Sequence, residues 1–329
     1  MKLAIWGLGH IGGSLAEALA GHGELAVYDR DPVTRSAAAA AGLRVVDSEA
    51  ELVRSDVVIF AVPTGAVFSS VKAHLDNRRA TGIVAPVVVV DLASVKSGVV
   101  VPISELLSSD ASVSYLSLHP MAGREGSGFG SRDPHVLEDA IWAEVDTSTQ
   151  YGSDLVIDFL ALLSRQLRAC FLPLSVELHD RSVAQVSHLP HLIALALVRQ
   201  LHQSDHPPVA ELLAAGSFKG ATRVAATDPD RILDLCWPNR VALKAVLADF
   251  IALLMEVEGN LSEEEEVSLY RWIRSSQLVG QKRDDPNPTS TIWGGDVSEV
   301  KGYLDQIRDS GRRIAETSHE GGSVVLRTI

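Results

Sequence analysis

The first half of the chain alternates short apolar segments with segments rich in helix-forming residues. Continuous apolar runs bounded by turn residues are typical of parallel strands that are covered on both faces. The pattern predicts strands at residues 2–6, 25–29, 43–46, 56–62, 86–91, 115–118, 140–145 and 169–172. Helical segments, including residues 14–20 and 32–41, lie between most of them. We therefore expect an α/β domain with a doubly wound, Rossmann-type sheet over residues 1–174.

The second half of the chain has a different pattern. Long helical periodicities cover residues 175–202, 208–215, 230–259 and 262–281, and the pattern contains no further clear strand. Residues 284–289 contain proline and aspartate and are expected to form a loop, followed by a helix at 297–317 and a loosely held tail. Residues 175–329 are therefore expected to form a second, mostly α-helical domain.

A glycine-rich segment, GLGHIG, follows the first predicted strand and opens the first predicted helix. Gly7 permits a tight turn, Gly9 lets backbone amides approach a pyrophosphate, and Gly12 allows the helix to lie close to the strand. This context distinguishes a dinucleotide-binding fingerprint from an ordinary glycine-rich turn. The predicted cofactor contacts are Gly7, Leu8, Gly9, His10, Ile11, Gly12, Asp29, Arg30, Val62 and Pro63.

The acidic residue at the end of the second predicted strand bears on the choice of dinucleotide. Asp29 is placed to accept hydrogen bonds from an adenosine ribose and would repel a 2′-phosphate. Arg30 beside it would offset part of that repulsion. We therefore expect NAD, with NADP as the less favoured alternative.

Composition excludes several other classes of protein. A chain of 329 residues with 46% hydrophobic residues suggests two domains with large cores. The net charge of −13 argues against a nucleic-acid surface, and no apolar run approaches the ~18 residues of a membrane span. Two cysteines, Cys170 and Cys236, make no disulfide framework, so we expect a cytoplasmic protein without a secretion signal.

Polar residues follow two of the predicted parallel strands. Ser94 lies after the strand at 86–91, and His119 ends the strand at 115–118. In a doubly wound sheet, ligands bind outside the carboxyl ends of the strands, so both side chains are expected beside the nicotinamide. A neutral imidazole is a common acceptor for a hydroxyl proton, which makes His119 the predicted general base. A histidine that only caps a strand end is the alternative.

The helical half carries a second group of polar residues. His179 and Asp180, with His188 and His191, could be imagined as a metal cluster, but the two pairs are separated by about three turns of helix. Hydride transfer to a nicotinamide needs no Lewis acid, so no metal is expected. Arg223 suits bidentate recognition of a carboxylate, with a surface ion pair as the alternative.

The strings GLGHIGGS, DLASVK, HPMAGREGSG, ELHDRSVAQVSHLPH and GSFKGATRVAATDP occur in this order over residues 1–260. Together they resemble the prephenate and arogenate dehydrogenase family of tyrosine biosynthesis. The resemblance implies a Rossmann domain followed by a helical dimerisation domain, and hence a homodimer with a small-molecule substrate. It also implies NAD(P)-dependent oxidative decarboxylation of a cyclohexadienol.

The resemblance also assigns roles to individual residues. His119 resembles the catalytic histidine that hydrogen-bonds the ring 4-hydroxyl, and Ser94 resembles the serine that helps place that hydroxyl and the nicotinamide. His191 is similar to the histidine of the substrate site, and Arg223 to the arginine that binds a substrate carboxylate.

Departures from the family pattern leave the substrate open. Arg124 and Glu125 replace a common Thr-Glu pair and are expected near the substrate, where Glu125 would favour the ammonium of arogenate slightly over prephenate. Gly220 stands where some members have an acid, and Ile232 where some have tryptophan. 4-Amino-4-deoxyprephenate, a ring-amino analogue used in specialised metabolism, is an alternative substrate.

Two other functions compete with this interpretation. A β-hydroxyacid dehydrogenase would use a lysine base from the helical domain, and Lys219 is the only lysine near the expected site. A non-catalytic NAD sensor would require none of the four polar residues Ser94, His119, His191 and Arg223.

Overall fold

A sheet of ten described strands runs through the computed structural model, in the order β2-β1-β3-β4-β5-β6-β7-β9-β10-β8. The structure describes residues 1–108, 110–123, 126–145, 153–261, 266–280, 291–320 and 323–329. Strands β2 to β5 are mutually parallel, whereas β6 runs antiparallel to β5 and parallel to β7. The predicted parallel sheet is confirmed, and its strand order reverses between β1 and β3.

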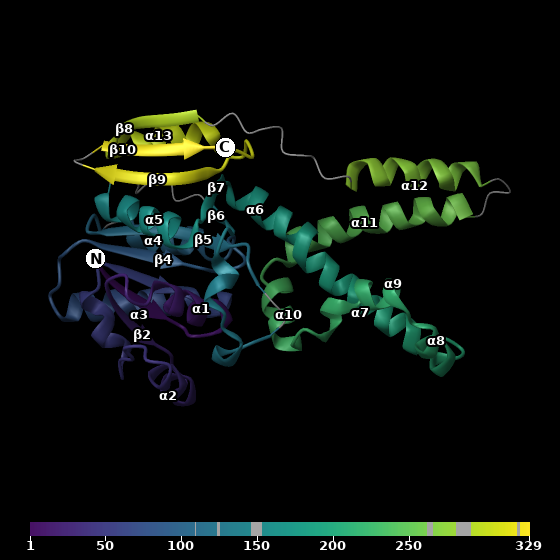
Figure 1. The fold of residues 1–329 in the computed structure, drawn as a ribbon, viewed down its shortest axis with the longest axis horizontal. Coiled ribbons are helices and arrows are strands. Elements are labelled where there is room, and N and C mark those ends of the chain that lie inside the picture. The colour runs from purple at the N-terminus through teal and green to yellow at the C-terminus, as the bar shows by residue number, and fades with distance from the viewer. Residues whose placement is uncertain (109, 124–125, 146–152, 262–265, 281–290, 321–322) are drawn as a thin grey trace.

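The first seven strands and five helices build the Rossmann-type part of the chain (Figure 1). The strands are β1 Lys2–Trp6, β2 Glu24–Tyr28, β3 Val57–Phe60, β4 Val87–Asp91, β5 Val113–Pro120, β6 Ile141–Val145 and β7 Cys170–Leu174. The helices are α1 His10–Leu19, α2 Pro32–Ala40, α3 Thr64–Ala80, α4 Val100–Leu107 and α5 Asp154–Leu167.

Apolar side chains cover both faces of this sheet. On β1, Leu3 and Ile5 belong to one buried cluster together with residues of α1 and α5, whereas Ala4 and Trp6 belong to a second cluster with residues of α3 and α4. Successive side chains of a strand point to opposite faces, so a fully apolar strand requires helices on both sides. The continuous apolar runs in the sequence reflect this arrangement.

The predicted strand at 43–46 is not formed. Val45 makes only an isolated bridge to Val27, although the backbone of this segment still bonds to β2. Glu49–Arg54 then forms a short 3₁₀ helix whose capping box joins Ser48 and Glu51. This early turn leaves too few residues for a full strand.

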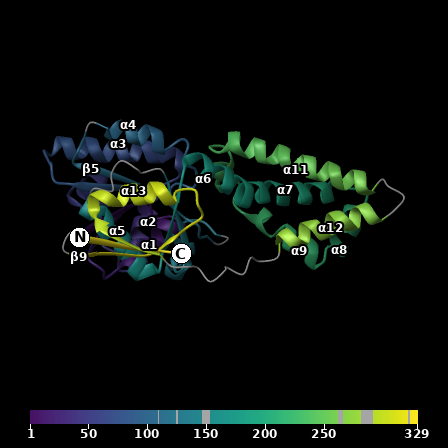
Figure 2. The same cartoon turned by 90° about the horizontal axis from the view of Figure 1, so that it is seen from above.

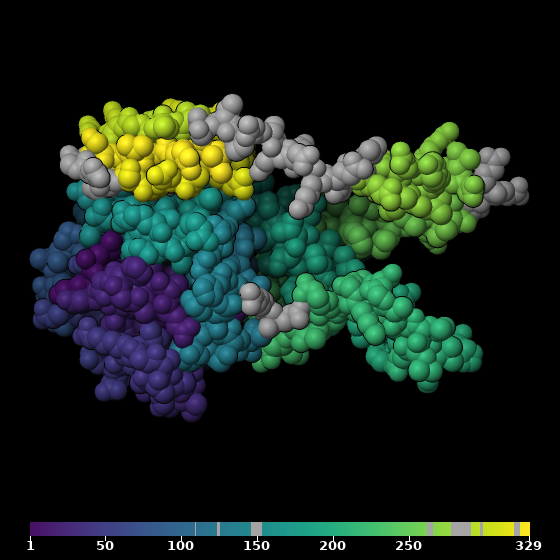
Figure 3. Space-filling model, in the orientation of Figure 1, coloured from purple at the N-terminus to yellow at the C-terminus, as the bar shows by residue number. Residues whose placement is uncertain are grey.

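The helical part projects from the sheet and has two arms, as Figures 2 and 3 show. Its helices are α6 Val176–Val183, α7 Leu189–His202, α8 Pro207–Leu213, α9 Gly216–Ala221, α10 Pro229–Cys236, α11 Arg240–Leu261 and α12 Val267–Gly280. The expected boundary after residue 174 falls between β7 and α6. No helix among the described residues has the length and apolar character needed to cross a bilayer.

Helices α6 and α7 join through one wide π-helical turn, Ala184–His188. Leu189 donates its backbone N–H to the carbonyl of Ala184, five residues earlier. Pro190 follows directly and has no N–H to donate, so the regular bond to the carbonyl of Val186 cannot form. Such π turns occur frequently at functional sites.

The C-terminal segment differs from the prediction. Instead of a helix at 297–317 and a loose tail, residues 291–328 form a β-α-β-β unit, which we call the C-terminal module: β8 Thr291–Asp296, α13 Val297–Ile307, β9 Ile314–Glu320 and β10 Ser323–Thr328. Asp309 and Gly311 adopt positive φ angles and turn the chain after α13. Strand β9 pairs antiparallel with β7, so the module extends the sheet of the first half.

Buried and exposed residues alternate along strand β10 of the module, a pattern that the sequence analysis overlooked. Along β10, Val324, Leu326 and Thr328 are buried and the residues between them are exposed. Val300, Leu304 and Ile307 of α13 join the same buried cluster as α5. The module is thus part of the main core.

We expect Leu326→Ala to lower the free energy of unfolding by about 2–5 kcal/mol, because it removes a side chain buried in this core. Urea denaturation of the whole chain measures the change. Val325→Ala is the matched control, since Val325 is the exposed neighbour on the same strand. Equal effects of the two substitutions would contradict the placement of the module.

Candidate active site

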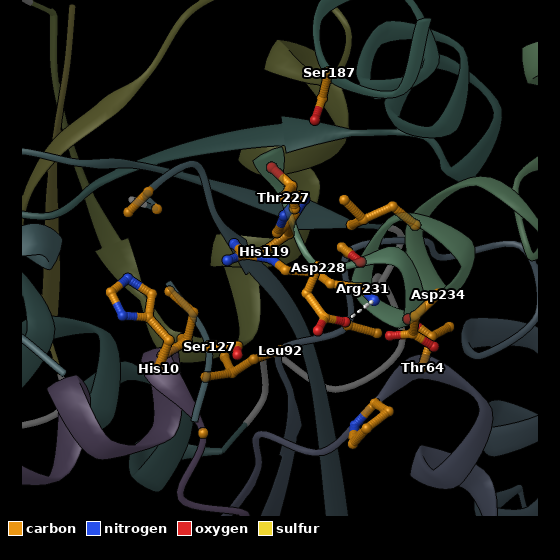
Figure 4. Close-up of a pocket in the computed structure, with 18 of the residues that line it drawn as sticks. His10, Thr64, Leu92, His119, Ser127, Ser187, Thr227, Asp228, Arg231 and Asp234 are labelled. Carbon is orange, nitrogen blue, oxygen red and sulfur yellow. Dashed lines mark hydrogen bonds between the residues drawn. The ribbon is translucent and has the colours of Figure 1, made fainter. Parts of the chain in front are cut away.

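A cavity of about 880 Å³ lies where the carboxyl ends of the parallel strands face the helical part (Figure 4). Its walls come from the turn before α1, the ends of β3, β4 and β5, the π turn between α6 and α7, and the segment from Arg223 to Leu235. The cavity adjoins the point at which the strand order reverses, between β1 and β3. Ligands of open α/β sheets bind at this kind of crevice.

Most of the predicted site residues line this one cavity. They are Gly9, His10, Ile11, Val62, Pro63, Ser94, His119, His191 and Arg223. Gly7, Leu8, Gly12, Asp29 and Arg30 do not line it: the first three belong to the glycine turn and the last two follow β2. Arg124 and Glu125 lie outside the described residues. His119 and Arg223 therefore line one cavity, which also contains Gly9 of the glycine turn.

The glycine turn has the geometry that a pyrophosphate group requires. Gly7 has a φ of +101°, and a Cβ on Gly12 would lie 2.0 Å from the carbonyl oxygen of Gly7. A Cβ on Gly9 would meet no protein atom within 4 Å, although Gly9 lines the cavity. Helix α1 begins at Gly9 without a side-chain cap, so its first N–H groups and the positive end of its dipole are available to an anion.

The carboxylate of Asp29 is held at the end of β2. Its Oδ2 accepts the N–H of Leu8 at 2.7 Å, and its Oδ1 accepts the N–H of Asp31 at 2.9 Å. The side chain that contacts the end of β2 is that of Arg35, not Arg30. Arg35 donates to the carbonyl of Asp29 and lies over the ring of Tyr28. The glycine turn and this fixed carboxylate fit a dinucleotide with an unmodified adenosine ribose.

Behind the cavity, two histidines and a carboxylate form a chain of hydrogen bonds. Nδ1 of His119 lies 2.9 Å from Nε2 of His179, and Nδ1 of His179 lies 2.8 Å from Oδ1 of Asp180. Asp180 also accepts the backbone N–H groups of Lys96 at 2.9 Å and Ser97 at 2.8 Å. The chain links strand β5 to helix α6.

These contacts determine which nitrogen of each imidazole carries the proton. Burial tends to raise the pKa of Asp180, but the hydrogen bonds from His179, Lys96 and Ser97 lower it overall, so the carboxylate stays ionised and can only accept. His179 must therefore donate from Nδ1 and accept at Nε2. His119 in turn must donate from Nδ1, which leaves the lone pair of its Nε2 unprotonated.

The imidazole of His119 remains neutral near pH 7. It is partly accessible from the cavity but lies deep in the protein, and this desolvation lowers its pKa well below the ordinary value. The neighbouring His179 and Lys96 lower the pKa of His119 further. A neutral imidazole with a free Nε2 beside a cavity is a competent general base.

The two histidines of the SHLPH string take different positions. His188 is buried, accepts from the side-chain amide of Asn239 at 3.2 Å, and has its pKa lowered by burial to about 4. His191 is half-buried and its Nδ1 donates to the carbonyl of Val224 at 3.3 Å. Both line the cavity, and the π turn brings them there.

The sequence analysis missed several groups on the α10 side of the cavity. Arg231 donates to the carbonyl of Gly126 at 2.6 Å and thereby connects α10 to the loop after β5. Asp234 is half-buried, which raises its pKa, and it accepts the N–H of Thr64 at the start of α3. Asp228 caps α10. These residues follow Arg223 closely in the sequence, but no local pattern shows that they line the cavity. The fold is needed to bring α10 against the ends of the strands.

The structure also places the residues of the competing interpretations. Lys219 is exposed on α9 and does not line the cavity, so it is poorly placed to act as a base. His179 and Asp180, considered above as metal ligands, are instead joined to His119 by hydrogen bonds. Within the part of the chain that the structure describes, no three His, Cys, Asp or Glu residues are grouped to hold a metal ion.

The chain is similar to proteins of known activity over most of its length. Two family models match it: the nucleotide-binding domain of prephenate dehydrogenase over residues 15–165, and the dimerization domain of prephenate dehydrogenase over residues 175–275. The prephenate dehydrogenase of Lactococcus lactis subsp. cremoris is 30% identical over 287 residues, which cover 84% of this chain and 73% of that protein.

Two further proteins are similar to the chain over most of its length. The cyclohexadienyl dehydrogenase of Zymomonas mobilis is 29% identical over 284 residues, which cover 84% of this chain and 93% of that protein. A solved structure of prephenate dehydrogenase from A. aeolicus, in complex with hydroxyphenyl propionate and NAD+, has a TM-score of 0.74. It is 24% identical, and the match covers 85% of this chain and 97% of that one, so it supports the fold alone.

We expect Gly9→Val to weaken dinucleotide binding strongly while leaving the thermal unfolding temperature unchanged. A Cβ added to Gly9 meets no protein atom within 4 Å, and Gly9 lines the cavity at the N-terminus of α1, so the added side chain competes with the dinucleotide for space. Titration of NADH fluorescence measures the dissociation constant. Gly302→Val on α13, also in open space, is the control, and unchanged NADH affinity in Gly9→Val would contradict the assignment of the turn.

Proposed function

The chain belongs to the prephenate dehydrogenase family, and we propose that it catalyses the NAD-dependent oxidative decarboxylation of a prephenate-type cyclohexadienol. The observation that carries this proposal is the single cavity that joins the glycine turn, the neutral imidazole of His119 and the guanidinium of Arg223. In that cavity a dinucleotide, a base and an anion-binding group can act on one substrate.

The dinucleotide would be held by the first N–H groups of α1 and by the carboxylate of Asp29. Val62 and Pro63, at the end of β3, line the same side of the cavity. Asp29 favours NAD, because a 2′-phosphate would lie beside its fixed negative charge. When bound, the nicotinamide supplies the hydride acceptor.

His119 performs the proton transfer in this proposal. Its Nε2 accepts the proton of the hydroxyl on ring carbon C4. The hydride leaves this same carbon, and the ring carboxylate leaves as carbon dioxide. The resulting imidazolium donates from Nδ1 to His179, which Asp180 orients. Aromatisation of the ring drives the loss of the carboxylate, and the imidazolium then returns the proton to the phenolate oxygen, so that the product is a phenol. Ser94, which lines the cavity on the loop after β4, would orient the hydroxyl.

The helical part supplies the groups for the anionic end of the substrate. Arg223 would bind a carboxylate through its planar guanidinium, and His191 lies on the same side of the cavity. Arg124 and Glu125 are proposed to lie close to the side chain of the substrate. Prephenate, arogenate and the ring-amino analogue 4-amino-4-deoxyprephenate all remain candidates, because they share the ring and its carboxylate.

The test of this function is formation of NADH with prephenate, arogenate, 4-amino-4-deoxyprephenate and a simple 3-hydroxyacid offered separately. Turnover of prephenate or arogenate supports the proposal, and turnover of 4-amino-4-deoxyprephenate alone would favour that alternative substrate, which has an amino group in place of the ring hydroxyl. Turnover of the 3-hydroxyacid alone would favour a β-hydroxyacid dehydrogenase, and NADH binding without any turnover would favour a non-catalytic sensor.

We expect His119→Asn to reduce kcat by about 10²–10⁴-fold, the usual contribution of general-base catalysis. NADH affinity should change much less, because the α1 turn is untouched. In the parent enzyme, kcat/KM should fall on the acid side only below pH 6.5, because the lowered pKa keeps His119 neutral above that pH. Unchanged turnover in the variant, or an acid limb above pH 7, would remove His119 from this role.

A homodimer is proposed for the assembly, because the match over residues 175–275 is to a dimerization domain. Helix α11 supports this by exposing a group of large apolar side chains: Ile251, Leu253, Leu254 and Met255 are each about half exposed. A two-fold axis would bury the same surface of both copies. We also propose a cytoplasmic location, consistent with the free thiols Cys170 and Cys236.

We expect the double substitution Leu254→Glu/Met255→Glu to shift the protein from dimer to monomer in light scattering, because it places charges in an apolar interface. Val84→Glu, at an exposed position between α3 and β4, is the control and should leave the mass unchanged. A monomeric parent protein, or a dimer that survives the double substitution, would contradict the interface.

A further inference from the structure

Lys96 is buried completely beside the proposed active site, and the mechanism above assigns its side chain no role. Its Nζ lies 2.7 Å from Oδ1 of Asp91, which is also fully buried, and 2.8 Å from the carbonyl oxygen of Leu118. Asp91 further accepts the hydroxyl of Tyr115 at 2.7 Å and the N–H of Ala93 at 2.9 Å. The ion pair is therefore enclosed by hydrogen bonds.

Each contact of Lys96 reaches a different part of the catalytic arrangement. The ion pair joins Asp91 to Lys96, five residues later, and so holds together the two ends of the loop that carries Ser94. The bond to Leu118 fixes the backbone of β5 immediately before His119. The backbone N–H of Lys96 holds the carboxylate of Asp180, at the other end of the histidine chain.

Stability alone does not account for such a pair. Two charges lose much of their hydration in the interior, and replacing a buried ion pair by apolar residues of similar size is often neutral or stabilising. The geometric effect is more specific, because the ammonium of Lys96 can bond both Asp91 and the carbonyl of Leu118 only while the loop after β4 and strand β5 keep this arrangement.

We propose that Lys96 is a positioning residue that holds His119 from both sides, through Leu118 on its own strand and through Asp180 and His179 on its Nδ1. This inference rests on the proposed function, because it assigns His119 the role of base. Lys96 does not line the cavity and touches no reacting atom, so it acts only through the residues that it holds.

The charge of Lys96 should also influence the protonation of His119. The charged and titratable groups that act on His119 are Lys96, His179, His188 and Asp180. Of these, the lysine disfavours the imidazolium and the aspartate favours it. Removing the lysine charge should therefore raise the pKa of His119 and move the acid limb of kcat/KM to higher pH.

The main test is the double variant Lys96→Met/Asp91→Asn, which removes both charges together and so leaves no unpaired ion in the core. We expect kcat to fall about 10²-fold, the typical cost of a displacement of about 1 Å at a reacting group. KM and NADH affinity should change little, and the acid limb should stay close to that of the parent, because the positive charge of Lys96 and the negative charge of Asp91 are removed together. Lys72→Met/Asp76→Asn, which removes an exposed ion pair on α3, is the matched control.

A second measurement does not depend on turnover. In ¹⁵N-imidazole NMR of the whole protein, the parent should have His119 protonated at Nδ1 only, and the double variant should show a mixture of tautomers. Lys96→Gln, which keeps a donor and leaves Asp91 charged, should show a smaller loss of kcat, together with a higher titration midpoint of His119 and an acid limb at higher pH.

The outcomes separate this inference from the proposed function. If the parent protein turns over no cyclohexadienol but the Lys96 variants show the NMR changes, the proposed function is refuted and Lys96 remains the residue that positions His119. An active parent whose Lys96 variants keep the parental kcat, acid limb and tautomer would refute the positioning role alone.

Discussion

The carboxylate of Asp180 is the constraint on which the candidate active site depends. It accepts two backbone N–H groups from the loop after β4 and the Nδ1–H of His179, so it can serve only as an acceptor. That single restriction passes through His179 to His119 and determines which nitrogen of His119 carries the proton. The proposed general base is thus prepared by a group that does not line the cavity, in the way that a buried aspartate orients the histidine of a serine protease.

The same carboxylate joins the two parts of the chain. His119 belongs to the sheet, whereas His179 and Asp180 belong to the first helix of the helical part. Within the helical part, Asn239 holds α6 against the π turn, because its side-chain amide bonds both the carbonyl of Asp180 and the ring of His188. A rigid junction is needed because general-base catalysis depends on hydrogen-bond distances.

Local patterns in the sequence predicted the elements of the site but not their connections. The glycine turn, Asp29 and the strand ends at Ser94 and His119 follow directly from apolar runs and from the turn chemistry at their ends. Long-range partners carry no such pattern. His179 and Asp180 stand together in the quoted string ELHD, yet nothing local indicates that they face a strand that ends 59 residues earlier at Pro120.

The C-terminal module shows the same limit of local reasoning. Its alternation of buried and exposed residues along β10 is a clear strand pattern, but its position beside β7 depends on one pairing, Phe171 with Ile314, and on packing against α5. A short alternating segment can join either edge of a sheet or form a hairpin of its own. Tertiary contact decides among these arrangements.

The position of this module gives it a structural effect on the active site. Asp309, in the turn after α13, accepts the N–H of Ser175, and the hydroxyl of Ser175 accepts the N–H of Leu178 in the first turn of α6. The N–H of Asp309 donates to the carbonyl of Pro173 on β7. Because His179 and Asp180 follow in the next positions of α6, the turn that ends α13 fixes the start of the helix that orients the base. Residues at the far end of the chain therefore stabilise the hydrogen-bond chain to His119, although none of them lines the large cavity.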